Sequence, residues 1–127
     1  MGSGGEPPGN PTRRGASRLR VRLPAFADLH SGTVRVVLCD LSLGGAKVFT
    51  PALLPIGRDV LLRWGAFDAF GTVIWERDGL HGIRFEEPLP AAMLIGTRDL
   101  HDAGSMTRNE IAEWLADHGW DFGKALN

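Results

Sequence analysis

The stretch TVRVVLCDLSLGGAKVFT, residues 33–50, contains two apolar segments separated by a short polar turn. Valine, leucine and phenylalanine are frequent in the flanks 33–41 and 46–50, and residues of this kind favour β-strands. Between the flanks, aspartate, serine and a pair of glycines are typical of a tight turn. The stretch therefore predicts two strands joined by a turn that exposes a carboxylate, a hydroxyl and backbone N–H groups on one side.

Four further segments on either side of this stretch also have the length and composition of strands. The segment 19–29 alternates apolar with other residues, and Pro24 within it predicts a sheet edge or a bulge. Asp78 and Gly79 form a typical hairpin turn. The remaining strands are expected at 58–64, 69–75 and 80–86. Six closely spaced strands without a helical period between them predict a mainly β fold, an antiparallel barrel or sandwich.

The two ends of the chain differ in character from the strand-rich part. The first twelve residues are mostly Gly and Pro, and without apolar side chains to bury they are expected to be disordered. After Pro88, a short helix is predicted to begin near Pro90, and a second helix is predicted at 107–119. We therefore divide the chain into a disordered tail, a barrel domain and a helical extension that packs on the barrel, at 1–12, 13–88 and 89–127.

The second predicted helix has clear start and face signals. Thr107 and Glu110 have the spacing of a capping box. Ile111, Trp114 and Leu115 form one apolar face of the helix. This face permits two interpretations: it packs against the barrel, or it docks a downstream protein partner.

Composition limits the class of protein. The 127 residues are 43% hydrophobic and 23% charged with a formal net charge of −1, which is typical of one globular domain. A single cysteine, Cys39, excludes an internal disulfide, and its apolar surroundings favour a buried packing role over a reactive thiol. No apolar run is long enough to span a membrane and no secretory signal pattern is present, so a cytoplasmic location is expected.

Positive charge is concentrated near the N-terminus. Residues 1–24 contain five arginines and one acidic residue, whereas residues 25–127 contain nine basic and fourteen acidic residues. This distribution argues against a broad nucleic-acid-binding face but permits a local basic site. Arg20 and Arg22 alternate with apolar residues, so we assign them to the solvent-exposed face of the first strand.

The other three arginines form a separate group, in which Arg13 adjoins the R-x-x-x-R pair Arg14 and Arg18. The interval from Arg18 to Asp40 equals one strand out, a short loop and one strand back. A hairpin of that size would return Asp40 to the neighbourhood of Arg18. The basic segment and the acidic turn are therefore expected to meet.

RGASR (14–18) followed by DLSLGG (40–45) resembles the PilZ domain family, bacterial receptors for cyclic di-GMP. The family pattern is R-x-x-x-R, then a strand, a loop and a strand, then D/N-x-S-x-x-G. GTVIW (71–75) and GIRF (82–85) resemble the late strands of the family, and the resemblance covers about residues 12–88. It implies a six-stranded antiparallel β-barrel, often with a helix at the C-terminal end.

The resemblance also implies which residues contact the ligand. One wall would consist of arginines that bind phosphate and guanine, namely Arg13, Arg14 and Arg18. The second wall would be the turn residues Asp40, Ser42 and Gly45. Glycine in such a turn can adopt positive φ and lets a ligand approach the backbone. Trp75 is a looser candidate, because some family members place a late-strand tryptophan against a guanine base, but a packing role is equally open.

These residue types suit a ligand with two guanines and two phosphates. A planar guanidinium group donates paired hydrogen bonds to guanine O6 and N7 or to phosphate oxygens, and its flat face stacks on a base. The Asp40 carboxylate can accept hydrogen bonds from the N1–H and N2–H₂ edge of guanine. We expect ligand capture to order the 12–18 segment against the barrel and to change the surface offered to a partner.

Two other functions are compatible with part of the sequence. A nucleic-acid-binding module could use the basic arm at 13–22, although the acidic body would repel a phosphate backbone. An adaptor could act by protein contact alone through the C-terminal helix. An enzyme is not expected, because Ser42 has no nearby general base in sequence. No metal or other cofactor is expected either. The four histidines are scattered along the chain without the spacing of metal ligands, and they are His30, His81, His101 and His118.

Overall fold

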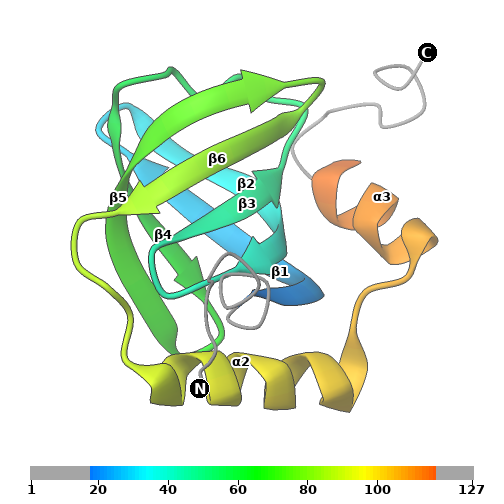
Figure 1. Ribbon diagram of the computed structural model, residues 1–127. Helices are drawn as coiled ribbons and strands as arrows, with labels where there is room; N and C mark the ends of the chain where they lie inside the picture. The colour runs from blue at the N-terminus through cyan, green and yellow to red at the C-terminus, as the bar shows by residue number, and fades with distance from the viewer. Residues whose placement is uncertain (1–17, 117–127) are drawn as a thin grey trace, which may run out of the picture.

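Six antiparallel strands close into a barrel in the computed structural model, which describes residues 18–116 (Figure 1). The strands are β1 (Leu19–Leu29), β2 (Gly32–Leu41), β3 (Gly45–Phe49), β4 (Asp59–Trp64), β5 (Phe67–Arg77) and β6 (Leu80–Phe85). Hydrogen-bonded neighbours follow the order β1-β2-β3-β6-β5-β4, and β4 pairs with β1 to close the ring. The predicted mainly β fold is confirmed, and it is a barrel.

Several predictions from the sequence concern residues outside 18–116. They are the disordered tail at 1–12, the positions of Arg13 and Arg14, and the end of the second helix near residue 119.

Alternate residues of the strands fill the barrel interior. In β1, Val21 and Leu23 are buried while Arg20 and Arg22 are exposed, as the alternation predicted. A strand has a side-chain period of two, so a closed sheet buries one face of each strand against a common core. The largest fully buried side chains include Trp64, Leu38, Leu41, Leu54, Leu62 and Ile83.

The N-terminal half of β1 is irregular. Its register with β2 shifts between Arg20 and Leu23, and its pairing with β4 begins only at Phe26. Pro24 therefore lies next to a bulge, where β1 has not begun to pair with β4, as expected for a residue without a backbone N–H. The predicted turn between β5 and β6 is also present, because Asp78 and Gly79 both have positive φ, 52° and 86°.

Helix α2 (Ala91–Gly104) lies across one end of the barrel (Figure 1). The indole N–H of Trp64 donates to Thr97 Oγ1 at 2.9 Å, and Thr97 Oγ1 donates to the Met93 carbonyl at 2.6 Å. The prediction of a short helix near Pro90 was wrong in length, since α2 has 14 residues. The helix continues past the predicted segment through Thr97, which is fully buried and bonded to Trp64, and local sequence carries no signal of that contact.

The end of α2 is hydrogen-bonded to the irregular part of β1. The backbone N–H of Arg22 donates to His101 Nδ1 at 3.3 Å, and the Met106 N–H donates to the Arg22 carbonyl at 2.9 Å. These bonds supply partners for backbone groups beside the bulge. The helical extension therefore helps to hold the strand that begins directly after Arg18.

Helix α3 (Arg108–Ala116) packs on the outer surface of the barrel. The capping box is confirmed: Thr107 N–H donates to Glu110 Oε1 at 2.8 Å, and Glu110 N–H donates to Thr107 Oγ1 at 3.1 Å. Trp114 Nε1 donates to the Val36 carbonyl of β2 at 3.2 Å, and its ring meets Phe26 edge-on at 5.3 Å.

The apolar face of α3 is thus occupied within the chain. Leu115 is buried, Trp114 is half-buried against the barrel, and Ile111 is partly exposed. Of the two interpretations of this face, packing against the barrel is therefore observed for Trp114 and Leu115. Docking of a downstream partner through Ile111, Trp114 and Leu115 stays a prediction. Neither of the helices described in residues 18–116 is long and apolar enough to cross a membrane.

Candidate ligand-binding site

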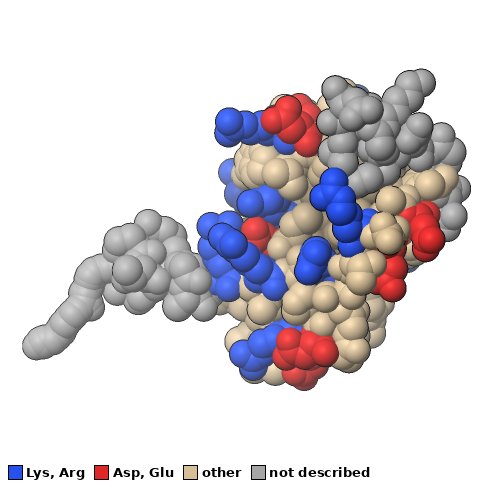
Figure 2. Space-filling view, turned by 90° about the vertical axis from the view of Figure 1, so that its right-hand side faces the viewer, with Lys and Arg blue, Asp and Glu red and all other residues tan. Residues whose placement is uncertain are grey.

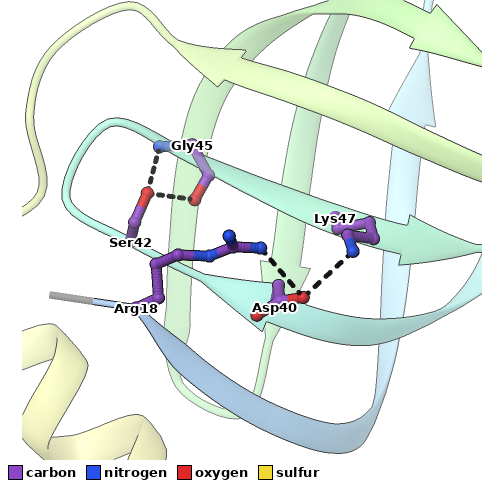
Figure 3. Close-up of polar contacts among 5 residues, drawn as sticks. All are labelled: Arg18, Asp40, Ser42, Gly45 and Lys47. Atoms are coloured by element: carbon purple, nitrogen blue, oxygen red, sulfur yellow. Dashed lines mark hydrogen bonds and ion pairs between the residues drawn. The ribbon is translucent and has the colours of Figure 1, made fainter. Parts of the chain in front are cut away.

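The arginine segment and the acidic turn meet at one end of the β1–β2 pair. Arg20 lies opposite Asp40 in the register of β1 and β2. Two residues earlier, the Arg18 guanidinium reaches the Asp40 carboxylate, with Nη2 and Oδ2 3.5 Å apart (Figure 3). The meeting predicted from the interval between these residues is therefore confirmed.

Asp40 is held by cations from two sides. Lys47, opposite Asp40 in β3, places Nζ 3.3 Å from the same oxygen, Oδ2, that Arg18 approaches (Figure 3). The Asp40 side chain is only 13% exposed. Its other oxygen, Oδ1, is buried and has no hydrogen-bond partner among the described residues. A buried carboxylate oxygen without a partner is costly, so a hydrogen-bond donor that reached this atom would stabilise it.

The turn between β2 and β3 is closed by Ser42 and Gly45. The Ser42 N–H donates to the Gly45 carbonyl at 2.8 Å, and Ser42 Oγ lies 3.2 Å from both the carbonyl and the N–H of Gly45 (Figure 3). Neither Gly44 nor Gly45 has positive φ, so the expected use of that conformation does not occur. Gly45 instead meets a steric demand: a Cβ there would lie 2.5 Å from the Ile83 carbonyl oxygen of β6.

The same turn is hydrogen-bonded to the end of β6 and to the segment that links β6 to α2. The Phe85 N–H donates to the Gly44 carbonyl at 2.9 Å, and the Leu89 N–H donates to the Leu43 carbonyl at 2.8 Å. The turn is therefore fixed both across its own ends and to the start of the helical extension.

Trp75 of β5 forms part of the opposite side of the site. Its indole packs directly on Gly82 of β6, where a Cβ would lie 2.0 Å from Nε1. The side chain stays 38% exposed. It also lines a groove of about 540 Å³ that is shared with Arg18, Asp40, Ser42 and Gly45. Trp75 therefore has the packing role weighed for it and also lines the groove, and its contact with a guanine base stays a prediction.

Two cationic residues of this groove were not found from the sequence. Lys47 and Arg84 both line it, on strands β3 and β6. Their positions follow from register, because Lys47 pairs with Asp40 and Arg84 pairs with Gly45. The alternation within the stretch 45–49 could have placed Lys47 beside Asp40, but Arg84 required the pairing of β3 with β6, which are distant in sequence.

Charge is distributed unevenly over this side of the molecule. Figure 2 shows Lys and Arg side chains gathered across the middle of one face, with Asp and Glu mostly toward its edges. Within the groove itself, Arg18, Lys47 and Arg84 outnumber the single carboxylate of Asp40. The groove therefore suits an anionic ligand that also carries hydrogen-bond donors.

Cys39 lies next to Asp40 in β2. Burial, together with the negative charge of Asp40, raises the pKa of the Cys39 thiol to about 11, so it stays protonated near neutral pH. In residues 18–116, no group of three or more His, Cys, Asp and Glu side chains could hold a metal ion.

Comparison with known proteins identifies the family of the chain. A sequence model of the PilZ domain matches residues 12–97, and the chain belongs to the PilZ domain family. Domains of this family are in general receptors for cyclic di-GMP, and they are binding or adaptor modules.

A solved structure is also similar to the chain, the crystal structure of the PilZ domain of CeSA from a cellulose-synthesising bacterium. The identity is 21%, the match covers 68% of this chain and 95% of that chain, and the TM-score is 0.47. Comparison with curated proteins finds no match.

Proposed function

We propose that this protein is a cytoplasmic receptor for cyclic di-GMP that binds the ligand in the groove between Arg18 and Trp75 and has no enzymatic activity. The observation that carries the proposal is the composition of this groove. It is lined by the described residues of the family pattern, Arg18, Asp40, Ser42 and Gly45, together with the indole of Trp75.

Each group has a chemical counterpart in the ligand. Asp40 Oδ1, which has no partner among the described residues, would accept from the N1–H and N2–H₂ edge of a guanine. Arg18 would exchange its 3.5 Å contact with Asp40 for a phosphate or the Hoogsteen edge of a guanine. Trp75, 38% exposed, offers a flat surface on which a base can stack.

The proposed site also includes Arg13 and Arg14, which lie outside the described residues. We expect them to bind the phosphates, so that ligand capture orders the segment 12–18 against the barrel. Ordering of this segment beside β1 would change the surface that the receptor presents to a downstream protein.

Calorimetry with cyclic di-GMP tests the proposal. We expect saturable heat with the wild type and at least about a tenfold loss of affinity in Arg14→Ala and in Asp40→Ala, because each removes a charged partner of the ligand. Arg58→Ala is the matched control, since Arg58 lies by the other end of β1, in a cavity lined also by Leu29. Absence of heat with the wild type at roughly tens of micromolar ligand would reject the receptor.

The same titration with random single-stranded DNA distinguishes the nucleic-acid-binding alternative from the receptor. A phosphate-backbone binder would bind this DNA with comparable affinity and a steep salt dependence. The receptor is expected to prefer the cyclic dinucleotide strongly over the DNA.

A further inference from the structure

A second groove lies between β5, the segment 86–90 that follows β6, and the start of α2. Its cavity volume is about 320 Å³. Phe70 lines it and is 62% exposed, although a large aromatic side chain favours burial. Leu89 and Met93 are further apolar lining residues, and the acidic lining residues are Asp68, Glu86 and Glu87.

The charge of this groove is opposite to that of the ligand site. It is lined by three carboxylates, and none of its lining residues is Lys, Arg or His. Glu86 and Glu87 are exposed and form no ion pair with any described residue. An apolar surface with an acidic rim repels nucleic acid and anionic lipid, and it complements a basic segment that carries an apolar anchor.

Backbone hydrogen bonds connect this groove to the ligand site. The Glu86 N–H donates to the Phe70 carbonyl at 2.9 Å, which fixes the rim of the groove to β5. The neighbouring residues Phe85 and Leu89 donate to the carbonyls of Gly44 and Leu43. One short segment, 85–89, is therefore bonded to the acidic groove on one side and to the ligand-binding turn on the other.

We propose that the groove around Phe70 binds a basic segment of a partner protein, and that its affinity for this segment changes when the turn 42–45 binds ligand. An aromatic or large aliphatic side chain of the partner packs on Phe70, and flanking Lys or Arg side chains pair with Glu86 and Glu87. The coupling through the segment 85–89 rests on the proposed function, whereas the docking itself does not.

A labelled synthetic peptide with one tryptophan flanked by lysines tests the docking by fluorescence anisotropy. We expect saturable binding to the wild type and at least about a tenfold weakening in Phe70→Ser and in Glu87→Lys, since anchors and their charged neighbours dominate such interfaces. Ile95→Ser and Asp99→Lys are the matched controls, because both residues are exposed on α2 and do not line the groove. An analogue with glutamate in place of lysine should not bind.

Three results would overturn the docking proposal. They are no binding of the basic peptide at about 1 mM, equal binding by wild type and both groove variants, and self-association of the wild type that is lost in Phe70→Ser. The last result, measured by sedimentation, would assign the groove to a second copy of the chain.

The coupling is tested by repeating the peptide titration with saturating cyclic di-GMP. We expect the affinity to change by about fivefold or more in the wild type, and the change to be absent in Asp40→Ala. Unchanged affinity, when calorimetry confirms that cyclic di-GMP is bound, rejects the coupling. No heat in that calorimetry rejects the receptor instead and leaves the docking result standing.

Discussion

Several residues of the candidate site also have structural roles. Gly45 meets the Ile83 carbonyl, Trp75 covers Gly82, and Asp40 is held by Lys47 as well as by Arg18. A substitution at such a position changes the fold and the site together. Its effect on binding is interpretable only beside a measurement of stability.

Gly45→Ala is expected to destabilise the barrel by about 1–3 kcal/mol, because the new methyl group would lie 2.5 Å from a backbone oxygen of β6. Gly44→Ala is the matched control, since no atom lies within 4 Å of its Cβ position and its φ is not positive. Urea unfolding of both variants measures the difference. Equal stability of the two variants would contradict the steric role of Gly45.

His81 makes stability depend on pH. The Leu54 N–H donates to Nε2 at 3.2 Å, and Nδ1 lies 3.1 Å from the Gly79 carbonyl, so the buried ring is neutral. Burial lowers its pKa below the usual 6.5. Because the folded state disfavours the charged ring, the contribution of His81 to stability is present above pH 6.5 and is lost as the pH falls below it.

Urea midpoints measured from about pH 7.5 to about pH 5 check this dependence. The wild type is expected to lose stability steadily below pH 6.5, whereas His81→Gln should be less stable at neutral pH but flatter across the range. His30→Gln, which changes an exposed histidine, should retain the slope of the wild type. An unchanged slope in His81→Gln would refute the assignment.

At the scale of secondary-structure elements, the sequence correctly predicted the features that depend on contacts between residues close in the chain. Strand positions followed from alternation, the start of α3 followed from Thr107 and Glu110, and the meeting of Arg18 with Asp40 followed from the length of one hairpin. The length of α2 could not be predicted in this way, because it depends on the contact between Trp64 and Thr97, which are distant in the chain. Arg84 was missed for the same reason, since its place depends on the pairing of β3 with β6, which are distant in sequence.

Helix α3 is attached to the barrel mainly through Trp114. Its indole donates to Val36, meets Phe26 edge-on and lies under the guanidinium of Arg35, with 4.3 Å between the Arg35 carbon and the ring centre. Trp114→Ala is therefore expected to cost about 2 kcal/mol and to release α3 without unfolding the barrel.

Hydrogen exchange distinguishes this local release from global unfolding. In Trp114→Ala, amides of 108–116 should lose protection while those of β2 keep theirs. Glu113→Ala, an exposed change on the same helix, should leave both sets protected. Cyclic di-GMP affinity should stay unchanged, because Trp114 does not line the ligand groove. Loss of protection throughout the barrel would show that α3 is required for the whole fold.

At the scale of the whole molecule, charge is separated between two grooves of one small barrel. The ligand groove carries Arg18, Lys47 and Arg84, and the second groove carries Asp68, Glu86 and Glu87. A net charge of −1 conceals this separation. At 0.1 M salt, interactions between exposed charges more than about 10 Å apart are largely screened, so distant surface charges contribute little to the affinity of either groove.

Lys47 and Arg84, the groove cations outside the family pattern, allow a test of how much nearby charge contributes to ligand binding. The double variant Lys47→Gln and Arg84→Gln should weaken cyclic di-GMP binding by roughly twofold to thirtyfold, since each partly solvated charge contributes about 0.2–1 kcal/mol. The salt dependence of the affinity should also become shallower. Arg58→Gln with Arg77→Gln is the matched control, because it removes the same net charge from residues that do not line the ligand groove. If both double variants weaken binding equally, net charge governs the affinity; a larger loss in the first pair would place Lys47 and Arg84 at the bound ligand.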